Sequence, residues 1–224
     1  MSPASPRRAA PGPGPRRRDE ARALFRNAIL EAAEDVFGEH GFHRARIQDV
    51  AARARIAVGT VYNHFEHKDE VLRALMEERT EALLGELEAR AEDPKTYEER
   101  LAARVERMLR YVEAHRAFFA LASEQGIFGA SGASAAALGG KAAKNLARAR
   151  AMFADLIDEG LAAGALAPID PATLARTLGG IVRAFALAAL EPGAPGVASD
   201  ASLIAHLFVH GASKPQPRAS KRPR

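Results

Sequence analysis

The sequence predicts an all-α fold, and three observations support this prediction. Apolar residues recur at the three-to-four spacing of a buried helical stripe through most of the chain, and no segment shows the strict alternation of a half-buried strand. Signals that end or start helices divide these stripes, among them Gly41, Asp93-Pro94 and Asp170-Pro171. Hydrophobic residues make up 47% of the 224 residues, which is enough for a sizeable core.

The first predicted helix starts near Glu20 and buries a stripe that includes Phe25, Ile29 and Val36. It ends at Gly41, because glycine adopts the left-handed conformation of a helix end without a Cβ penalty. The other predicted helices are Ile47–Ala54, Val58–Phe65, Lys68 to about Ala91, about Leu101–His115, Arg116–Gln125, about Leu146–Gly164, Pro171–Leu190 and Asp200–Gly211. The Gly- and Ser-rich segment 126–140 is expected to be a flexible connection or a frayed helix start.

Composition excludes several classes of protein. Cysteine is absent, which rules out disulfides and thiolate metal sites and fits a reducing cytoplasm. No run of eighteen apolar residues occurs, so we expect no membrane-spanning helix and no membrane partner. The N-terminus carries arginines but lacks the apolar segment of a secretory signal. No Ser-His-Asp, phosphate-loop or paired-carboxylate arrangement stands out, so we expect neither an enzyme nor a cofactor.

Residues 47–65 have the size and pattern of a DNA-reading helix-turn-helix, in which a short turn joins two short helices. In the second helix, Val61 and Phe65 are apolar at i and i+4, and Gly59, Thr60, Tyr62, Asn63 and His64 are small or polar. The apolar side is therefore expected to anchor the helix in the core, and the polar side is expected to face outward as the presented side.

With its flanks, this motif resembles the TetR (tetracycline repressor) family of transcriptional regulators. The resemblance lies in Gly41-Phe42, in Asp-Val-Ala at 49–51, in Val-Gly-Thr-Val-Tyr-Asn-His-Phe at 58–65 and in Lys-Asp-Glu-Val-Leu at 68–72. It implies about nine helices, with three in a DNA-binding head and the rest in a body that binds a ligand and forms a dimer. On this basis we divide the chain into a disordered basic tail (1–19), a head (20–67), a body (68–212) and a second disordered basic tail (213–224).

The net charge of +4 hides an uneven distribution. Residues 1–18 and 213–224 hold ten arginines and lysines and no acid, so the remainder has 22 basic and 28 acidic residues, a net charge of about −6. Such termini cannot fold alone, and inert disorder is one interpretation of both. Because the N-terminal tail leads into the helix-turn-helix, attraction to phosphates or insertion into the minor groove is a second interpretation there.

The predicted DNA contacts lie on the presented side of the motif and at its borders: Arg44, Arg46, Val58, Gly59, Thr60, Tyr62, Asn63, His64 and Lys68. Gly59 in a first helical turn costs up to about 1 kcal/mol relative to alanine, which a close approach to DNA would explain, with helix packing as the alternative. The resemblance implies that Tyr62 and His64 touch the DNA backbone, although a half-buried surface tyrosine is the other interpretation. Lys68 opposes the helix dipole, and a bound phosphate would reverse that penalty.

The chain departs from the family pattern at its helix caps. Arg46, Ala57 and His67 stand where a hydroxyl cap is usual, and each missing cap oxygen costs about 1 kcal/mol. Arg55 stands where the turn usually has glycine. We expect arginines to supply phosphate charge in place of these caps, with Arg46 the best placed.

The body offers aromatic and apolar side chains as candidate lining of a ligand pocket, although each of them also fits plain core. The predicted ligand contacts are Arg104, Met108, Tyr111, Phe118, Phe119, Phe128, Phe153 and Phe185, with His115, Glu124 and Arg183 as further polar anchors. The last two helices are rich in small residues and resemble the family's dimer helices, with packing inside one chain as the alternative. The predicted dimer contacts are Leu178, Ile181, Phe185, Leu203 and Leu207.

Four histidines form two H-x-x-H pairs, His40 with His43 and His64 with His67. Each pair straddles a helix end and lacks an obvious carboxylate partner, so we expect no metal site. The sequence thus predicts a homodimeric repressor that binds a palindromic operator in double-stranded DNA and is released by a small hydrophobic effector. The alternative is a DNA-binding regulator without an effector, controlled by a protein partner or by its own abundance.

Overall fold

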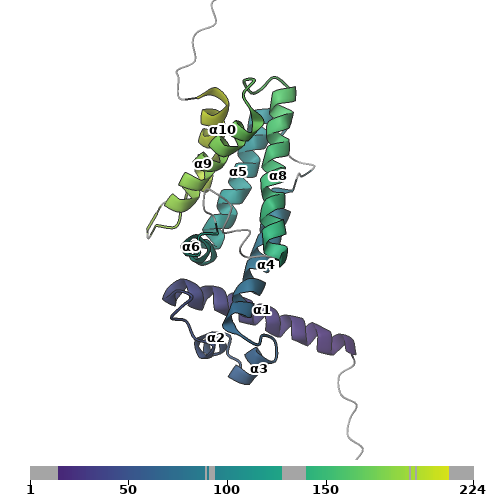
Figure 1. The fold of residues 1–224 in the computed structure, drawn as a ribbon, viewed down its shortest axis with the longest axis vertical. Helices are drawn as coiled ribbons and strands as arrows, with labels where there is room; N and C mark the ends of the chain where they lie inside the picture. Colours follow the sequence, from purple (N-terminus) through teal and green to yellow (C-terminus); the bar gives the residue numbers. More distant parts are fainter. Residues whose placement is uncertain are drawn as a thin grey trace, which may run out of the picture. The chain divides into compact units, whose positions relative to one another are not determined.

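The computed structural model describes residues 15–88, 90, 94–127, 140–191, 193–194 and 196–211 (Figure 1). Within these ranges the chain forms nine α-helices, one short 3-10 helix and no strand, which confirms the predicted all-α fold. The elements are α1 (Pro15–His40), α2 (Ile47–Arg53), α3 (Val58–Tyr62), α4 (Lys68–Leu87), α5 (Tyr97–Ala114), α6 (Arg116–Glu124), α8 (Gly140–Ala162), α9 (Pro171–Ala188), η1 (Ala198–Asp200) and α10 (Ala201–His210). In the described part of the chain, no helix is both long and apolar enough to cross a membrane.

The chain separates into two compact units, and the boundary lies between Leu72 and Arg73, inside α4. In the first unit α2 packs against α1, and α3 packs against α2. The core of this unit contains Ile29 and Phe37 from α1, Val50 from α2 and Val61 from α3, all at most 2% exposed. Ile29 and Val61 belong to the predicted stripes, whereas Phe37 and Val50 were not named in them. Burial of one apolar face holds each short helix in place.

The end of α1 follows the predicted signal. Gly41 has a φ of +74°, which a residue with a Cβ rarely adopts. The next residue, Phe42, is buried and meets Phe37 edge-on, with ring centroids 5.4 Å apart. Phe25, by contrast, is 44% exposed, so the first turns of the predicted buried stripe face outward.

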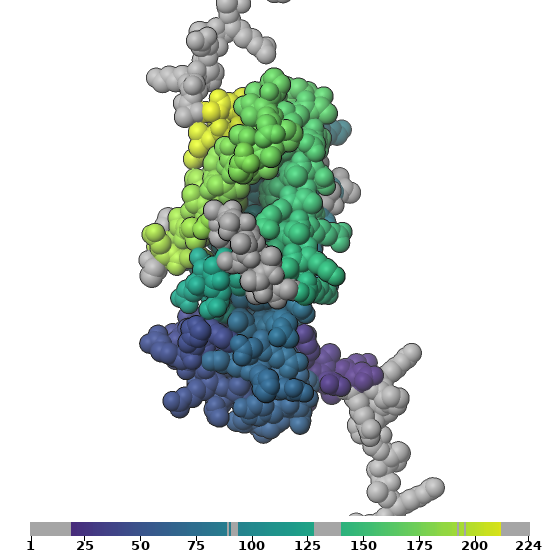
Figure 2. All heavy atoms as spheres, viewed as in Figure 1, coloured from purple at the N-terminus to yellow at the C-terminus, as the bar shows by residue number. Residues whose placement is uncertain are grey.

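The second unit contains α5, α6, α8, α9, α10 and most of α4. Helix α5 buries Leu101, Val105, Leu109 and Val112 along one stripe, and α10 packs along this helix (Figure 1). Helix α9 packs against α8, α5 and α10, and Figure 2 shows α8, α9 and α10 in green to yellow on the visible face of this unit. The predicted start of α9 is confirmed, because Asp170 Oδ2 accepts a hydrogen bond from the Thr173 N–H at 2.9 Å and Pro171 opens the helix.

Several helix ends differ from the prediction. Helix α1 begins at Pro15, inside the predicted disordered tail 1–19, α5 begins at Tyr97 rather than about Leu101, and α8 begins at Gly140 rather than about Leu146. Helix α3 ends at Tyr62 rather than Phe65, because the N–H groups of His64 and Phe65 both donate to the carbonyl of Val61 and close the chain into a turn. Helix α4 ends at Leu87 rather than near residue 91, and α10 begins one residue late, after the 3-10 turn. Most of the predicted Gly- and Ser-rich connection and most of the two basic tails lie outside the described residues.

Candidate functional site

The helix-turn-helix divides into a buried side and a presented side. Val61 is fully buried and Phe65 is 5% exposed, so they anchor α3 as the i, i+4 pair predicts. Tyr62 is 50% exposed, and Gly59 and Asn63 are also exposed. A Cβ added to Gly59 would meet nothing within 4 Å, so this glycine is not required by packing inside the chain.

The turn between α2 and α3 contains a strained residue. Arg55 has a φ of +57° and is the one non-glycine residue with a positive φ in the described part of the chain. The left-handed conformation costs about 1–2 kcal/mol for a residue with a Cβ. The turn is closed by the Ile56 N–H, which donates to the Ala51 carbonyl at 3.0 Å. Arg55 therefore holds, at the cost of strain, a left-handed conformation that a glycine would adopt freely.

Acidic residues in the first turns of α2 and α4 accept hydrogen bonds from N–H groups at or just before the helix starts. Asp49 Oδ2 accepts a hydrogen bond from the Arg46 N–H at 3.1 Å, and Glu70 Oε2 accepts one from the Glu66 N–H at 2.7 Å. A carboxylate at this position also interacts favourably with the positive end of the helix dipole. The loss of the hydroxyl caps at Arg46 and His67 is thus compensated in part by side chains three residues further on.

The arginines of the head have different surroundings. Arg53 joins α2 to α1 by ion pairs with Glu39 at 2.6 Å and Asp35 at 2.9 Å. The hydrogen bond from Arg53 lowers the pKa of Glu39. Arg44 Nε donates to the His40 carbonyl at 3.0 Å and caps the end of α1. The exposed guanidinium of Arg46 makes no ion pair with any described residue, which leaves its donors available to a ligand.

Lys68 directs its ammonium group to backbone carbonyls of the same unit, and its predicted phosphate contact stays a prediction. Its Nζ donates to the carbonyls of Phe42 at 2.6 Å, Ala45 at 3.0 Å and His43 at 3.2 Å. The same Nζ lies 4.5 Å from the centroid of the Phe42 ring. An ammonium group has three donors, and all three are occupied. Lys68 therefore ties the start of α4 to the segment that precedes α2, and a phosphate would have to displace one of these carbonyls.

His64 is partly buried beside Phe25 and Phe65, with ring centroids 6.4 Å away in each case. Burial lowers the pKa of His64, and the positive charges of Arg22 and Arg26 lower it further. At neutral pH the imidazole is therefore uncharged. It can donate one hydrogen bond, but it adds no positive charge to the surface.

The second unit contains a cavity of about 540 Å³ among α4, α5, α6, α8 and α9. Its lining is mostly apolar and includes Leu83, Leu87, Met108, Phe119, Leu146 and Phe153. Arg150, Arg176 and Arg183 also line it. The Nε of Arg183 is buried and has no hydrogen-bond partner among the described residues. A buried donor without a partner costs about 1–3 kcal/mol, so an acceptor that reached this N–H group would be stabilised there.

Only some of the predicted ligand contacts line this cavity. Met108, Phe119 and Phe153 line it. Phe118 is 1% exposed in the core, the Tyr111 hydroxyl donates to the Arg79 carbonyl at 2.8 Å, and Arg104 donates to the Met152 carbonyl at 2.9 Å. These three residues and Phe185 are not among the residues that line this cavity, and their contact with a ligand stays a prediction. Phe128 lies outside the described residues.

A family profile described as "Bacterial regulatory proteins, tetR family" matches residues 29–75, which span the helix-turn-helix and the start of α4. Over these residues the chain is similar to this family, as the resemblance in its sequence implies. The curated relatives are named as regulators and as a receptor, in agreement with the prediction of a regulator and not an enzyme. A curated relative, the fatty acid metabolism regulator protein of Bacillus subtilis, is 31% identical over 74 residues, which cover 33% of this chain and 38% of that protein. The A-factor receptor protein of Streptomyces griseus is 36% identical over 61 residues, which cover 27% of this chain and 22% of that receptor.

Solved structures show the same fold over most of the chain. The regulator FadR from Bacillus subtilis, in complex with stearoyl-CoA, aligns with a TM-score of 0.69 at 18% identity and covers 83% of this chain and 98% of its own. The TetR-family regulator PfmR from Thermus thermophilus aligns with a TM-score of 0.66 at 23% identity and covers 83% of this chain and 99% of its own. At these identities the similarity establishes the fold alone.

The cavity residues that were not predicted are mostly glycines and aliphatic residues, whereas the prediction relied mainly on aromatic side chains. Gly179 and Gly180 line the cavity, and a Cβ on either would meet nothing within 4 Å. Helix patterning marks such glycines as close-contact residues, whereas here they border open space. Leu83 and Leu87 of α4 are buried like ordinary core residues, and only the packing of α8 and α9 places them at a cavity.

The predicted dimer residues differ in their exposure. Leu203 is 50% exposed on α10, and Leu187, which was not predicted, is 39% exposed on α9. Ile181, Phe185 and Leu207 are partly exposed. Leu178 is 1% exposed inside one chain and lines the cavity, and its contact with a partner subunit stays a prediction.

Proposed function

We propose that this chain is a homodimeric transcriptional repressor that binds a palindromic operator in double-stranded DNA and is released by an effector. The observation that supports this most directly is the presented side of α3, where Gly59, Tyr62 and Asn63 are exposed while Val61 and Phe65 anchor the helix. A helix of this kind reads the major groove in helix-turn-helix proteins. Such a regulator works where the chromosome lies, which places it in the cytoplasm.

The proposed DNA surface contains direct readers and backbone contacts. Val58, Gly59, Thr60 and Asn63 lie on the proposed recognition helix or its end and face the bases, with Tyr62 and the neutral His64 on phosphates. Arg46 supplies the positive charge that Lys68 does not, because its guanidinium is exposed and unpaired within the described part of the chain. Arg44 lies beside it and contributes a second charge while it caps α1.

The effector is proposed to carry a long apolar chain and an acidic group. The cavity of about 540 Å³ suits a ligand of ordinary size, and its apolar walls suit a hydrocarbon chain. The unpartnered Nε of Arg183, with Arg150 and Arg176 on the same lining, suits an anionic acceptor. The structural relative FadR was solved with stearoyl-CoA, which combines both features, and we extend that ligand class to this chain as a proposal.

Release from the operator is proposed to follow when the effector changes which position of α4 is most populated. This helix begins in the first unit, where Lys68 holds three carbonyls, and carries Leu83 and Leu87 on the cavity of the second unit. A ligand that binds one position of α4 better than another changes the spacing of the two heads of a dimer. The two half-sites of an operator tolerate only one spacing, so the affinity falls.

The dimer is proposed to form through the exposed apolar side chains of α9 and α10. Leu187 and Leu203 are the most exposed large apolar residues there, and Gly180, Ala184 and Ala188 leave room for close approach of a second copy. Substitution of Leu203 by glutamate is expected to give monomers in sedimentation, whereas Ser202→Glu, at an exposed neighbouring position, is the matched control.

The test of DNA binding uses fluorescence anisotropy with the intergenic DNA upstream of the gene and with scrambled DNA of equal length. We expect tight, salt-dependent binding to the first DNA only. Arg46→Gln is expected to reduce the salt slope by about one, because one phosphate contact is lost, whereas Arg53→Gln changes the slope little. Equal affinity for both DNAs would remove the proposed function.

The test of release uses stearoyl-CoA, with free coenzyme A as the control that lacks the acyl chain. We expect only stearoyl-CoA to displace the protein from its operator. Arg183→Met is expected to weaken this ligand at least about tenfold, since a buried charge-assisted hydrogen bond is lost. If operator binding is intact and no acyl compound displaces the protein, the effector-independent alternative replaces this part of the proposal.

A further inference from the structure

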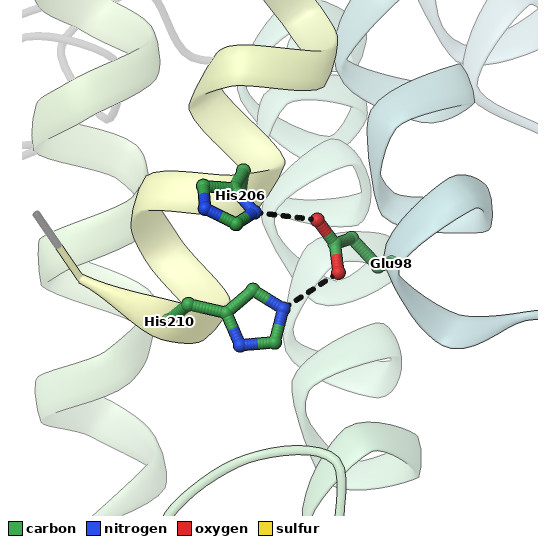
Figure 3. A group of neighbouring side chains, drawn as sticks. All are labelled: Glu98, His206 and His210. Carbon is green, nitrogen blue, oxygen red and sulfur yellow. Dashed lines mark hydrogen bonds and ion pairs between the residues drawn. The ribbon is translucent and has the colours of Figure 1, made fainter. Parts of the chain in front are cut away.

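Glu98, His206 and His210 bring three ligand atoms together in the second unit, away from the cavity lining (Figure 3). His206 Nδ1 lies 3.2 Å from Glu98 Oε1, and His210 Nε2 lies 2.7 Å from Glu98 Oε2. The two histidines occupy positions i and i+4 at the end of α10, and Glu98 lies in the first turn of α5. Their ligand atoms all lie within 4.8 Å of one another.

The arrangement matches the requirements of a transition-metal ion. Two histidines at i and i+4 of a helix point the same way and chelate one ion, as in helical zinc sites. With bonds of about 2.0–2.2 Å at tetrahedral angles, neighbouring ligand atoms lie roughly 3.3–3.5 Å apart. The pair of His206 Nδ1 and Glu98 Oε1 is already close to this separation. Glu98 supplies a single oxygen in such a site, and the three ligand atoms, one from each residue, lie within 4.8 Å of one another. They would therefore close by at most about 1.5 Å to reach the tetrahedral separation, which small side-chain rotations provide.

The surroundings leave room for an ion and its water. The side chains of His206 and His210 are 48% and 51% exposed, and that of Glu98 is 37% exposed, so the site opens to solvent. Three protein ligands with one open position are typical of zinc sites that keep a water molecule. Two neutral imidazoles and one carboxylate favour Zn²⁺ and its first-row neighbours over Mg²⁺ or Ca²⁺, which prefer oxygen ligands.

We propose that Glu98, His206 and His210 bind one divalent transition-metal ion per chain, with Zn²⁺ as the reference ion and water as the fourth ligand. The ion replaces the hydrogen bonds of Glu98 to the two imidazoles. It joins the last turn of α10 to the first turn of α5 by coordination bonds. The site is independent of the effector cavity and of the head, so it stands whether or not the proposed function is correct.

The chain offers few competing metal ligands, which makes the proposal easy to test. It has no cysteine and seven histidines, of which five lie outside the site. Untagged protein is titrated with ZnCl₂ by isothermal calorimetry. We expect one ion per chain, and we expect His206→Gln, His210→Gln and Glu98→Gln each to weaken binding at least about tenfold, as loss of a ligand requires. His43→Gln and His67→Gln change exposed histidines of the head and serve as matched controls.

A second measurement keeps the test valid if a variant folds poorly. Because binding to the folded state alone raises its stability, Zn²⁺ is expected to raise the Tm of the wild type and of the control variants but not of the three site variants. In a one-dimensional NMR spectrum of the wild type, one equivalent of Zn²⁺ is expected to shift the ring signals of two histidines. Absence of stoichiometric binding, or binding that survives both His206→Gln and His210→Gln, overturns the proposal.

Discussion

Gly160 provides the sharpest test of packing in the second unit. It lies on α8 where the helix meets Tyr97, the first residue of α5. A Cβ at this position would lie 2.5 Å from Tyr97 Cζ and 2.7 Å from Cε2. Ordinary carbon contacts are about 3.5–4.0 Å, so Gly160→Ala forces the ring or the helix to move by roughly 1 Å. Overpacking of this kind costs about 1–3 kcal/mol.

The helix itself contributes in the opposite direction, because alanine is favoured over glycine in a helix by about 0.5–1 kcal/mol. Gly85→Ala on α4 is the matched control, since a Cβ there meets nothing within 4 Å. We expect Gly85→Ala to stabilise the protein by about 0.5–1 kcal/mol, and Gly160→Ala to be about 1–3 kcal/mol less stable than this control. Urea unfolding followed by circular dichroism measures the difference. Equal stabilities of the two variants would show that the Tyr97 contact is not rigid and would refute the reasoning.

Three other substitutions test single contacts. Arg55→Gly removes the left-handed strain in the turn of the helix-turn-helix. After the entropic cost of glycine is subtracted, we expect the stability of the head to rise by about 0.5–1 kcal/mol, measured by hydrogen exchange. A loss of stability would contradict the strain argument. Lys68→Met leaves three carbonyls without their donor and is expected to destabilise the head by about 1–3 kcal/mol in the same assay, and an unchanged exchange rate would argue against it. Tyr97 has a buried hydroxyl without a partner among the described residues, and burial, with a smaller contribution from Glu159, raises its pKa to about 12. Because the folded state keeps this proton more tightly than the unfolded chain, stability is complete below pH 10 and declines from there through pH 12, and Tyr97→Phe should abolish this decline in alkaline unfolding curves.

Local chemistry in the sequence was sufficient to predict the helices and the two sides of the reading motif. Asp170-Pro171 and Gly41 predict helix ends because capping depends on neighbouring residues alone. Val61 and Phe65 predict the anchored side of α3 because the helical period places them together.

The features that were not predicted depend on residues far apart in the chain. Lys68 reaches carbonyls 23 to 26 residues earlier, and no sequence pattern distinguishes this role from a phosphate contact. His206 and His210 lie 108 and 112 residues from Glu98, so the cluster exists only after α10 packs on α5. The cavity likewise exists because small residues such as Gly179 have no neighbouring side chain against them. Composition does not show where in the fold this happens.

The three carbonyl contacts of Lys68 also decide how the first unit can deform. The first turn of α4 is fastened to the segment 42–45, which leads directly into α2. A displacement of this turn must either carry that segment along or break charge-assisted hydrogen bonds. The first unit is therefore expected to be displaced as one rigid piece rather than to bend internally. The orientation of α2 and α3 within this unit should not change when the first turn of α4 moves.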